Sequence, residues 1–265
     1  MDRYTHGHSD PVLRSHRWRT ARNSAAYLLD ELAPGQHLLD VGCGPGNLTA
    51  DLARIVDPGT AVGVDVAPGI IEVATGDNPR SESPNLSFRV ADTYGLDFDD
   101  DTFDVVHAHQ VLQHLSDPVA ALQEMRRVLK PGGTLAVRDA DYRAFMWSPG
   151  DPRLDRWQEL YHQVTLSNGA EANAGRHLFR WAMEAGFEEV RYSTSNWVFC
   201  TPEDREWWGN LWAERVQESD FSEQALEGGL SEPSELAAIA EAFRAWAADP
   251  YSVFVVPNGE VLASA

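Results

Sequence analysis

The stretch His-Leu-Leu-Asp-Val-Gly-Cys-Gly-Pro-Gly-Asn-Leu-Thr, residues 37–49, passes from an apolar run into three closely spaced glycines and then into a helical pattern. It predicts a strand, a tight turn and a helix in succession. Glycine lacks a Cβ atom, so the backbone at Gly42, Gly44 and Gly46 can turn sharply and a ligand can lie directly against its N–H groups. We therefore expect a small-molecule site at this turn.

The glycine spacing distinguishes this turn from the dinucleotide-binding one, which follows Gly-x-Gly-x-x-Gly. Here Asn47 stands where that pattern has its last glycine, and the observed order is Asp40-x-Gly-x-Gly-x-Gly. This order resembles the first motif of the class I S-adenosylmethionine (SAM)-dependent methyltransferases. The resemblance implies SAM as cofactor and disfavours a nicotinamide oxidoreductase.

Further strands follow, with helical segments between them except before the fourth strand, where the acidic loop 96–102 is expected. They are expected at 60–65, 86–90, 103–108 and 134–138. The first strand, 37–41, is apolar on both faces, as expected for a central parallel strand covered by helices. The pattern predicts an α/β fold with a Rossmann-like, doubly wound sheet, which binds ligands at the carboxyl ends of its strands.

Acidic residues stand at two of these strand ends. Asp65 ends the second strand and can accept both hydroxyls of a ribose; the alternative is a helix N-cap before Pro68. Asp92 follows the third strand, and the methyltransferase resemblance implies that it accepts the adenine amino group. The expected cofactor-binding residues are Asp40, Gly42, Cys43, Gly44, Gly46, Asn47, Asp65, Val66, Asp92, Thr93, His109 and Gln110.

Two later motifs narrow the resemblance. They are Gln-x-Leu-x-His-Leu-x-Asp-Pro at 110–118 and Arg-Val-Leu-Lys-Pro-Gly-Gly-Thr-Leu at 127–135. Together with the first motif they are similar to the ubiquinone/menaquinone-methyltransferase-like group over residues 38–138. That group implies a seven-stranded, mostly parallel sheet with an antiparallel last strand, an N-terminal helical lid and a C-terminal helical cap.

Candidate catalytic residues lie where the fourth strand ends. His109 and Gln110 are expected to face the transferred methyl group. A hydroxyl or enol acceptor also needs a base, and a histidine suits that role. Further candidates are His114, His8, His6 and His162; His114 lies in a motif shared by methyltransferases of different substrates, which favours a structural role for it.

The residues before the first strand and after the fifth are expected to form a lid and a cap. Tyr4, His6 and His8 belong to an N-terminal arm that is either a lid over the cofactor or a frayed terminus. Helices are expected at 11–18, 21–32, 152–167, 203–218 and 233–248, a sixth strand at 187–199, and a final strand interrupted at Pro257. One domain covers 1–265: arm and helices 1–36, SAM-binding core 37–139, substrate cap and closing strands 140–265.

Composition limits the partners. The formal net charge of −20 disfavours nucleic acid, whose binding requires Lys and Arg at phosphates. The sequence shows no signal peptide, disulfide framework, metal-ligand cluster or long apolar run, which predicts a cytoplasmic protein without metal or membrane contact. A homodimer is left open.

The sequence thus predicts a SAM-dependent methyltransferase acting on a small aromatic or apolar metabolite. The alternative is a protein of the same fold that keeps the cofactor for structure and serves binding or cyclisation without methyl transfer.

Overall fold

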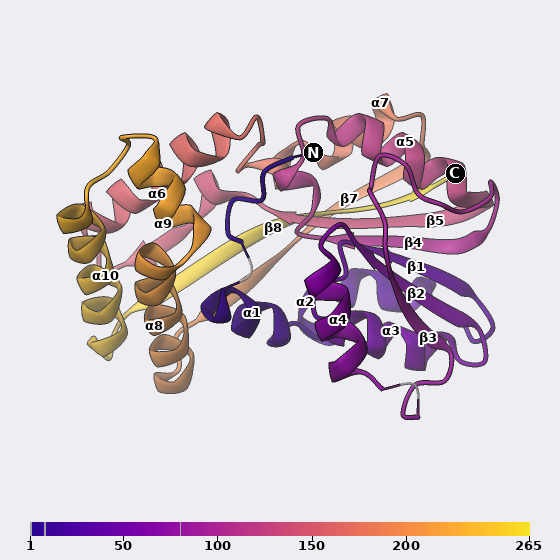
Figure 1. The fold of residues 1–265 in the computed structure, drawn as a ribbon, viewed down its shortest axis with the longest axis horizontal. Coiled ribbons are helices and arrows are strands. Elements are labelled where there is room, and N and C mark those ends of the chain that lie inside the picture. The colour runs from indigo at the N-terminus through magenta and orange to yellow at the C-terminus, as the bar shows by residue number, and fades with distance from the viewer. Residues whose placement is uncertain (1, 8, 80) are drawn as a thin grey trace.

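The computed structural model describes residues 2–7, 9–79 and 81–265, and within them a sheet of eight strands forms the centre of the molecule (Figure 1). The strand order is β3-β2-β1-β4-β5-β8-β6, and β7 pairs with β8 outside this path. The strands are β1 (His37–Val41), β2 (Thr60–Asp65), β3 (Leu86–Val90), β4 (Phe103–His109), β5 (Leu129–Ala140), β6 (Met146–Ser148), β7 (Glu188–Phe199) and β8 (Val253–Ser264). Strands β1 to β5 are parallel, and β8 is antiparallel to β5, β6 and β7. The predicted doubly wound α/β fold is confirmed, with the short β6 as an additional strand.

Proline sets the start of six helices, since its fixed φ suits the first turn and its missing N–H has no partner there. These six are α1, α4, α5, α6, α8 and α10. The helices are α1 (Asp10–Arg17), α2 (Ala21–Ser24), α3 (Asn47–Val56), α4 (Pro68–Asp77), α5 (Pro118–Val128), α6 (Pro152–Ser167), α7 (Leu178–Glu184), α8 (Pro202–Glu218), α9 (Asp220–Glu227) and α10 (Pro233–Ala248), with 3-10 turns η1 (Ala26–Glu31), η2 (Leu112–His114), η3 (Tyr142–Ala144) and η4 (Ala174–Arg176).

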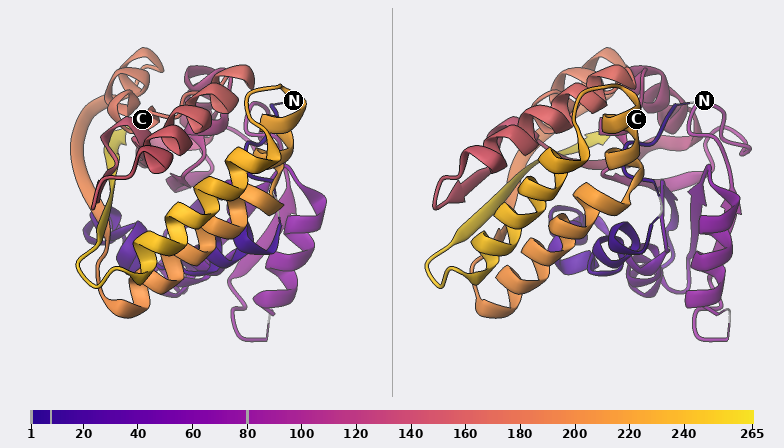
Figure 2. Two further views of the ribbon diagram at one scale, coloured as in Figure 1. Left: turned by 90° about the vertical axis from the view of Figure 1, so that its left-hand side faces the viewer. Right: turned by 60° about the vertical axis from the view of Figure 1, so that its left-hand side comes forward.

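Two apolar clusters pack on opposite faces of the parallel strands. Residues of α2, η1 and α3 fill one face, and residues of α5 and α7 fill the other. A third cluster, which we call the cap core, joins α6, α8, α9 and α10 to β6 and to the nearby ends of β7 and β8. Figure 2 shows α8 and α10 side by side in this cap, beyond the end of the parallel strands. The site therefore lies where the cap meets the carboxyl ends of these strands.

Three local expectations are wrong. The helix expected at 21–32 divides into α2 and η1, because Ala25 between them has non-helical angles (φ −136°, ψ 23°). Helix α9 was not expected; it begins after Ser219, whose extended backbone ends α8. Strand β8 is not interrupted at Pro257 but continues through it to Ser264. At Gly259 in this strand a Cβ atom would lie 2.0 Å from the carbonyl oxygen of Gly175, so only glycine fits there.

The N-terminal arm is packed rather than frayed. Thr5 and His6 are buried, and the Gln224 side-chain amide of α9 donates to the backbone oxygens of Tyr4 and Thr5 at 3.3 and 3.2 Å. Figure 1 shows the arm passing between the cap helices and the parallel strands. The arm thus forms part of the wall between these two regions.

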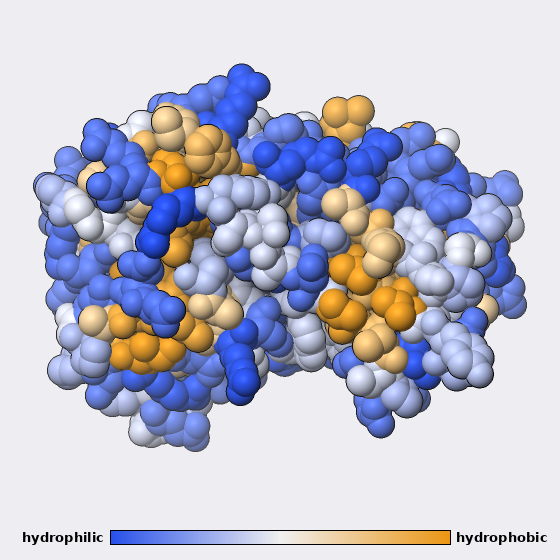
Figure 3. Space-filling view, turned by 180° about the vertical axis from the view of Figure 1, so that it is seen from behind, coloured by the Kyte–Doolittle hydropathy of each residue, from blue (hydrophilic) through white to orange (hydrophobic). Residues whose placement is uncertain are grey.

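The surface seen from behind is mostly hydrophilic, with hydrophobic residues gathered in separate areas (Figure 3). The large exposed hydrophobic residues come from several elements, among them Met146 of β6, Met183 of α7 and Leu226 of α9. Scattered apolar residues of this kind are usual on a protein surface. Among the described residues, no helix has the length and apolar character that crossing a membrane requires.

Candidate active site

The glycine turn after β1 is shaped by close contacts. Gly42 and Gly46 have positive φ, 71° and 80°, and a Cβ atom on either would lie 2.4 Å from a side-chain carbon, of Val111 and Phe88 respectively. At Gly44 the nearest atom to such a Cβ is Nδ1 of His16, at 3.6 Å. The turn is therefore packed at both ends and open in its middle.

The turn's first N–H groups are used within the protein. Those of Gly42 and Cys43 donate to the Val64 carbonyl at 2.8 and 3.0 Å, and that of Gly44 donates to Asp65 Oδ2 at 3.3 Å. These three donors do not face a ligand as expected. The turn instead offers a surface that a ligand can approach closely.

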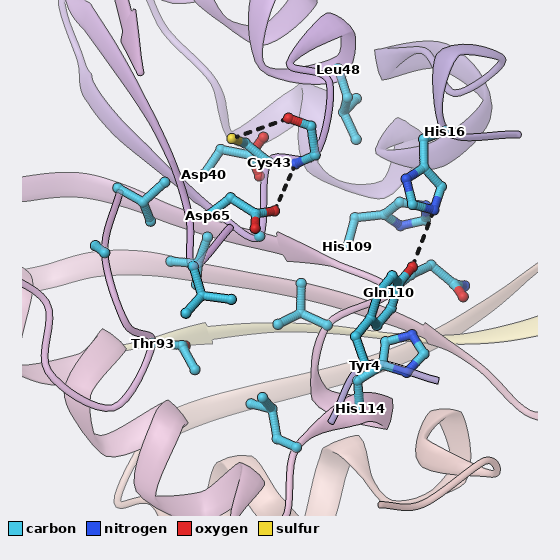
Figure 4. Close-up of a pocket in the computed structure, with 18 of the residues that line it drawn as sticks. Tyr4, His16, Asp40, Cys43, Leu48, Asp65, Thr93, His109, Gln110 and His114 are labelled. Atoms are coloured by element: carbon cyan, nitrogen blue, oxygen red, sulfur yellow. Dashed lines mark hydrogen bonds between the residues drawn. The ribbon is translucent and has the colours of Figure 1, made fainter. Parts of the chain in front are cut away.

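A cavity of about 210 Å³ lies over the open middle of the turn (Figure 4). It collects side chains from the ends of β1, β2, β3 and β4 and from the arm. All predicted cofactor residues except Gly46 line it: Asp40, Gly42, Cys43, Gly44, Asn47, Asp65, Val66, Asp92, Thr93, His109 and Gln110. Gly46 is the N-cap of α3 and packs on Phe88 instead. We call this space the cofactor cavity.

Asp40 has its carboxylate turned into the protein. Oδ1 lies 2.7 Å from Nδ1 of His107, and Oδ2 accepts from the Thr49 hydroxyl at 2.5 Å. The side chain is almost fully buried. Its contacts hold β1, β4 and α3 together beneath the turn.

Asp65 and Asp92 border the same cavity from neighbouring strand ends. Asp65 accepts from the N–H groups of Gly44 and Ala67, and Asp92 accepts from the N–H of Tyr94 at 3.0 Å. Each carboxylate oxygen has two lone pairs, so the single printed contact of Asp92 leaves acceptor capacity on that side chain. The hydroxyl of Thr93 is buried and has no partner among the described residues.

His109 and Gln110 lie together at the end of β4. Both ring nitrogens of His109 are buried without a partner in the described part of the chain, and burial holds its pKa well below the usual value. Gln110 has a positive φ of 59°, which is uncommon outside glycine and is often found in active sites. Its side chain bridges Asn258 of β8 and Gln113, both at 2.8 Å.

His114 lies against the arm. Its ring makes an edge contact with that of Tyr4, with centroids 4.7 Å apart, and Nε2 lies 3.0 Å from the Gln113 amide. Burial lowers the pKa of His114 to about 3, so the ring is neutral and a weak base. His6 is also buried, with Nε2 3.0 Å from the Tyr161 hydroxyl, and burial lowers its pKa well below the usual value.

The two other histidine candidates are His8 and His162. His8 lies outside the described residues. His162 is held by the Gln158 carbonyl and by Asn173, at 2.7 and 2.9 Å, and does not border the cofactor cavity.

Sequence reasoning missed Arg19, whose side chain lines the cofactor cavity. The Asn47 amide donates to the backbone oxygens of Arg17 and Arg19 and so fixes this segment beside the glycine turn. The Arg19 guanidinium also lies 5.9 Å from the ring centre of Trp197. A short basic run, Arg14 to Arg19, in an acidic chain was the available signal.

A second, smaller space of about 40 Å³ adjoins the cofactor cavity, and we call it the aromatic chamber. The two share Tyr4, His16, Arg19, Gln110 and His114 as lining residues. Six aromatic side chains of its wall belong to the cap core or pack on it: Tyr142, Phe145, Trp197, Trp207, Trp208 and Trp212. Several tryptophans thus lie beside the cofactor cavity.

No group of three or more His, Cys, Asp or Glu side chains suited to a metal ion occurs among the described residues. That the protein works without metal stays a prediction.

A parallel sheet with a glycine turn after its first strand, closed by antiparallel strands, is the Rossmann-like methyltransferase fold. A family model described as a methyltransferase domain matches residues 32–200, and the chain belongs to this family. The resemblance seen in the sequence is confirmed.

Relatives of similar length are also described as methyltransferases. An uncharacterized methyltransferase of Schizosaccharomyces pombe is 33% identical over 98% of this chain and 95% of its own length. A probable methyltransferase of Aspergillus luteorubrus is 32% identical over 86% of each chain.

Solved structures share the fold at lower identity. The [4+2]-cyclase SpnF matches with a TM-score of 0.57 and 22% identity over 98% of this chain and 86% of its own. A phosphoethanolamine N-methyltransferase of Haemonchus contortus, solved with phosphomonomethylethanolamine and S-adenosylhomocysteine, matches with a TM-score of 0.60 and 16% identity over 97% of this chain and 57% of its own.

Proposed function

We propose that this chain transfers a methyl group from SAM to a small aromatic or apolar metabolite. The observation that carries the proposal is the junction of the two spaces: the cofactor cavity and the aromatic chamber share lining residues at Gln110 and His114. A methyl donor in one space and an acceptor in the other would meet at this junction.

The residues of the cofactor cavity fit SAM. Asp65 would accept the ribose hydroxyls, and Asp92 the adenine amino group. Arg19 would hold the carboxylate, since it is the guanidinium that borders this cavity. The open middle of the glycine turn at Gly44 gives the room for close approach.

When bound, SAM supplies a methyl group on a positively charged sulfonium, which a nucleophile displaces directly. Holding the acceptor in line is the main contribution that a protein makes to such a displacement. The aromatic chamber would position the acceptor, and the buried arm at Thr5 and His6 would exclude water from it.

His6, His109 and His114 are not proposed as general bases. Burial lowers the pKa of His114 to about 3 and holds those of His6 and His109 well below the usual value, so a proton on any of them is unfavourable. We instead propose that His109 and Gln110 flank the transferred methyl group and align the acceptor. Residues 1–265 would act as one domain, because β8 belongs both to the sheet and to the cap core.

The test is calorimetric titration with SAM, S-adenosylhomocysteine and NAD, followed by assay of S-adenosylhomocysteine release with a panel of phenols, enols and organic acids. We expect binding of SAM and S-adenosylhomocysteine and turnover with some acceptors. Binding without turnover by any acceptor would favour the structural-cofactor alternative. Preference for NAD would overturn the proposal.

A further inference from the structure

Arg215 is a buried cation on the wall of the aromatic chamber. It lies in α8 with 5% of its surface exposed, and its guanidinium donates to the Ser15 hydroxyl and lies 5.0 Å from the ring centre of Trp212. Its Nε atom is buried without a hydrogen-bond partner in the described residues. The guanidinium therefore has hydrogen-bonding capacity that the protein does not use.

No carboxylate balances this charge. Among residues 2–7, 9–79 and 81–265, no Asp or Glu forms an ion pair with Arg215 or with Arg19, the second guanidinium of the chamber wall. By contrast, the buried Arg138 has Glu260 at 3.1 Å. The chain as a whole is rich in acidic residues, with a net charge of −20, so the lack of an acidic partner at these two arginines is not explained by composition.

The titratable groups around Arg215 leave it uncompensated. Burial raises the pKa values of Tyr142 and Tyr161 and lowers those of His6 and His114, so all four side chains are neutral near pH 7. Tyr4, whose pKa burial raises to about 12, is neutral as well. The described residues of the chamber wall thus include the guanidinium groups of Arg19 and Arg215 and no carboxylate.

An unpaired buried charge destabilises the folded protein unless something offsets it. Part of the offset is structural: Arg215 lies in the last turn of α8, where the helix dipole favours a cation, and it ties this helix to Ser15 of α1. Neither contact supplies a negative charge or engages Nε. A bound anion would do both.

We propose that the methyl acceptor is an organic anion, a carboxylate or a phosphate monoester, whose charged group binds Arg215 in the aromatic chamber. Its apolar body packs on the neighbouring tryptophans and places the nucleophilic atom toward Gln110. This inference rests on the proposed methyltransferase function and defines the class of its substrate.

The test uses calorimetry on the full chain saturated with S-adenosylhomocysteine. Propionate and benzoate are compared with the neutral propionamide and benzamide, and phenyl phosphate distinguishes phosphate from carboxylate. The variant is Arg215→Met, which removes the charge and keeps much of the volume. Arg205→Met is the matched control, because Arg205 lies in the same helix and is as buried, yet donates to the Cys200 carbonyl and borders neither space.

We expect at least one acid to bind about tenfold or more tightly than its amide, as for hydrogen bonds to a charged group. This preference should vanish in Arg215→Met and persist in Arg205→Met. Should Arg215→Met fail to fold, Arg215→Gln keeps a donor for Ser15 without the charge.

Equal binding of acids and amides, binding of neither, or an acid preference that survives in the Arg215 variant would overturn the inference. Failure of wild-type protein to bind S-adenosylhomocysteine would instead refute the proposed function, and this is measured first. The two failures are therefore distinguishable.

Discussion

Asp40 and His107 form a buried pair beneath the glycine turn, with Oδ1 of the carboxylate 2.7 Å from Nδ1 of the ring. The other carboxylate oxygen is taken by Thr49. The acidic residue that opens the glycine motif thus connects three elements through its side chain, so its main effect should be on stability.

Replacing Asp40 by alanine should lower the free energy of unfolding by about 3 kcal/mol, because His107 and Thr49 would lose their buried partner. Urea denaturation followed by circular dichroism measures this. Asp92→Ala, at an exposed position, serves as control and should change stability by less than about 0.5 kcal/mol. An Asp40→Ala protein of wild-type stability with weak SAM binding would show a direct cofactor contact instead.

Asp65→Ala should weaken SAM binding at least tenfold while leaving the fold intact. Losing a charged acceptor for two hydroxyls costs about 1.5–3 kcal/mol. Because Asp65 also accepts from the N–H groups of Gly44 and Ala67, Asp65→Asn tests whether loop order alone explains the loss. Asp97→Ala, in the exposed acidic loop, is the matched control for net charge. Unchanged affinity in Asp65→Ala would exclude the ribose role.

Deleting residues 1–9 should leave the sheet folded, lower the melting temperature and reduce turnover sharply. The reason is that Thr5 and His6 fill buried space between the cap and the junction. Hydrogen exchange should also show greater protection of residues 4–6 when S-adenosylhomocysteine binds.

Arg3→Ala is the control for the arm, since the ion pair of Arg3 with Glu227 is largely exposed and contributes little. Full activity of the truncated protein, or equal exchange of the arm with and without ligand, would show that the arm is not a lid.

The contribution of Asp139 to the free energy of unfolding should fall as pH rises. Burial raises the pKa of this carboxyl from 3.8 to about 7, although the Gln113 and Leu112 N–H groups act in the opposite direction. The folded protein therefore binds this proton more tightly than the unfolded chain, and stability contributed by Asp139 is present below pH 3.8 and lost as pH rises to about 7.

Asp139→Asn cannot ionise, so its stability relative to wild type should increase over this pH range by a few kcal/mol. Urea titrations of both proteins at several pH values measure the difference, which removes the contribution of other titrating groups. A difference that does not vary with pH would mean that Asp139 titrates normally.

The parallel part of the sheet could be predicted from the sequence because its signals are local. Apolar runs ending in Asp65 or in the glycine turn mark strands, and Pro118, Pro152 and Pro233 mark helix starts that the structure confirms. Placing these strand ends side by side needs only the topology of a doubly wound sheet, which is why most predicted cofactor residues line one cavity.

The chamber could not be predicted in the same way. Arg215 and His6 are far apart in sequence, and nothing in their neighbourhoods indicates that both border one space. The break at Ala25 is similarly non-local, since the residues on both sides of it favour a helix. Packing between distant segments decides these features, and a single sequence carries little information about it.

Strand β8 is hydrogen-bonded to Gln110 through Asn258 and contributes Val256 to the wall of the aromatic chamber, so one length of backbone extends from the junction of the two spaces into the cap. A strand is already extended, at about 3.3 Å per residue, so it cannot become longer. A shift of its register by one residue would turn every side chain to the other face of the sheet. Under the proposed function, β8 would therefore fix how far from the methyl donor an acceptor can bind. Relatives that take larger or smaller acceptors should differ in the side chains along β8, such as the one at Val256. The position of the cap should stay the same.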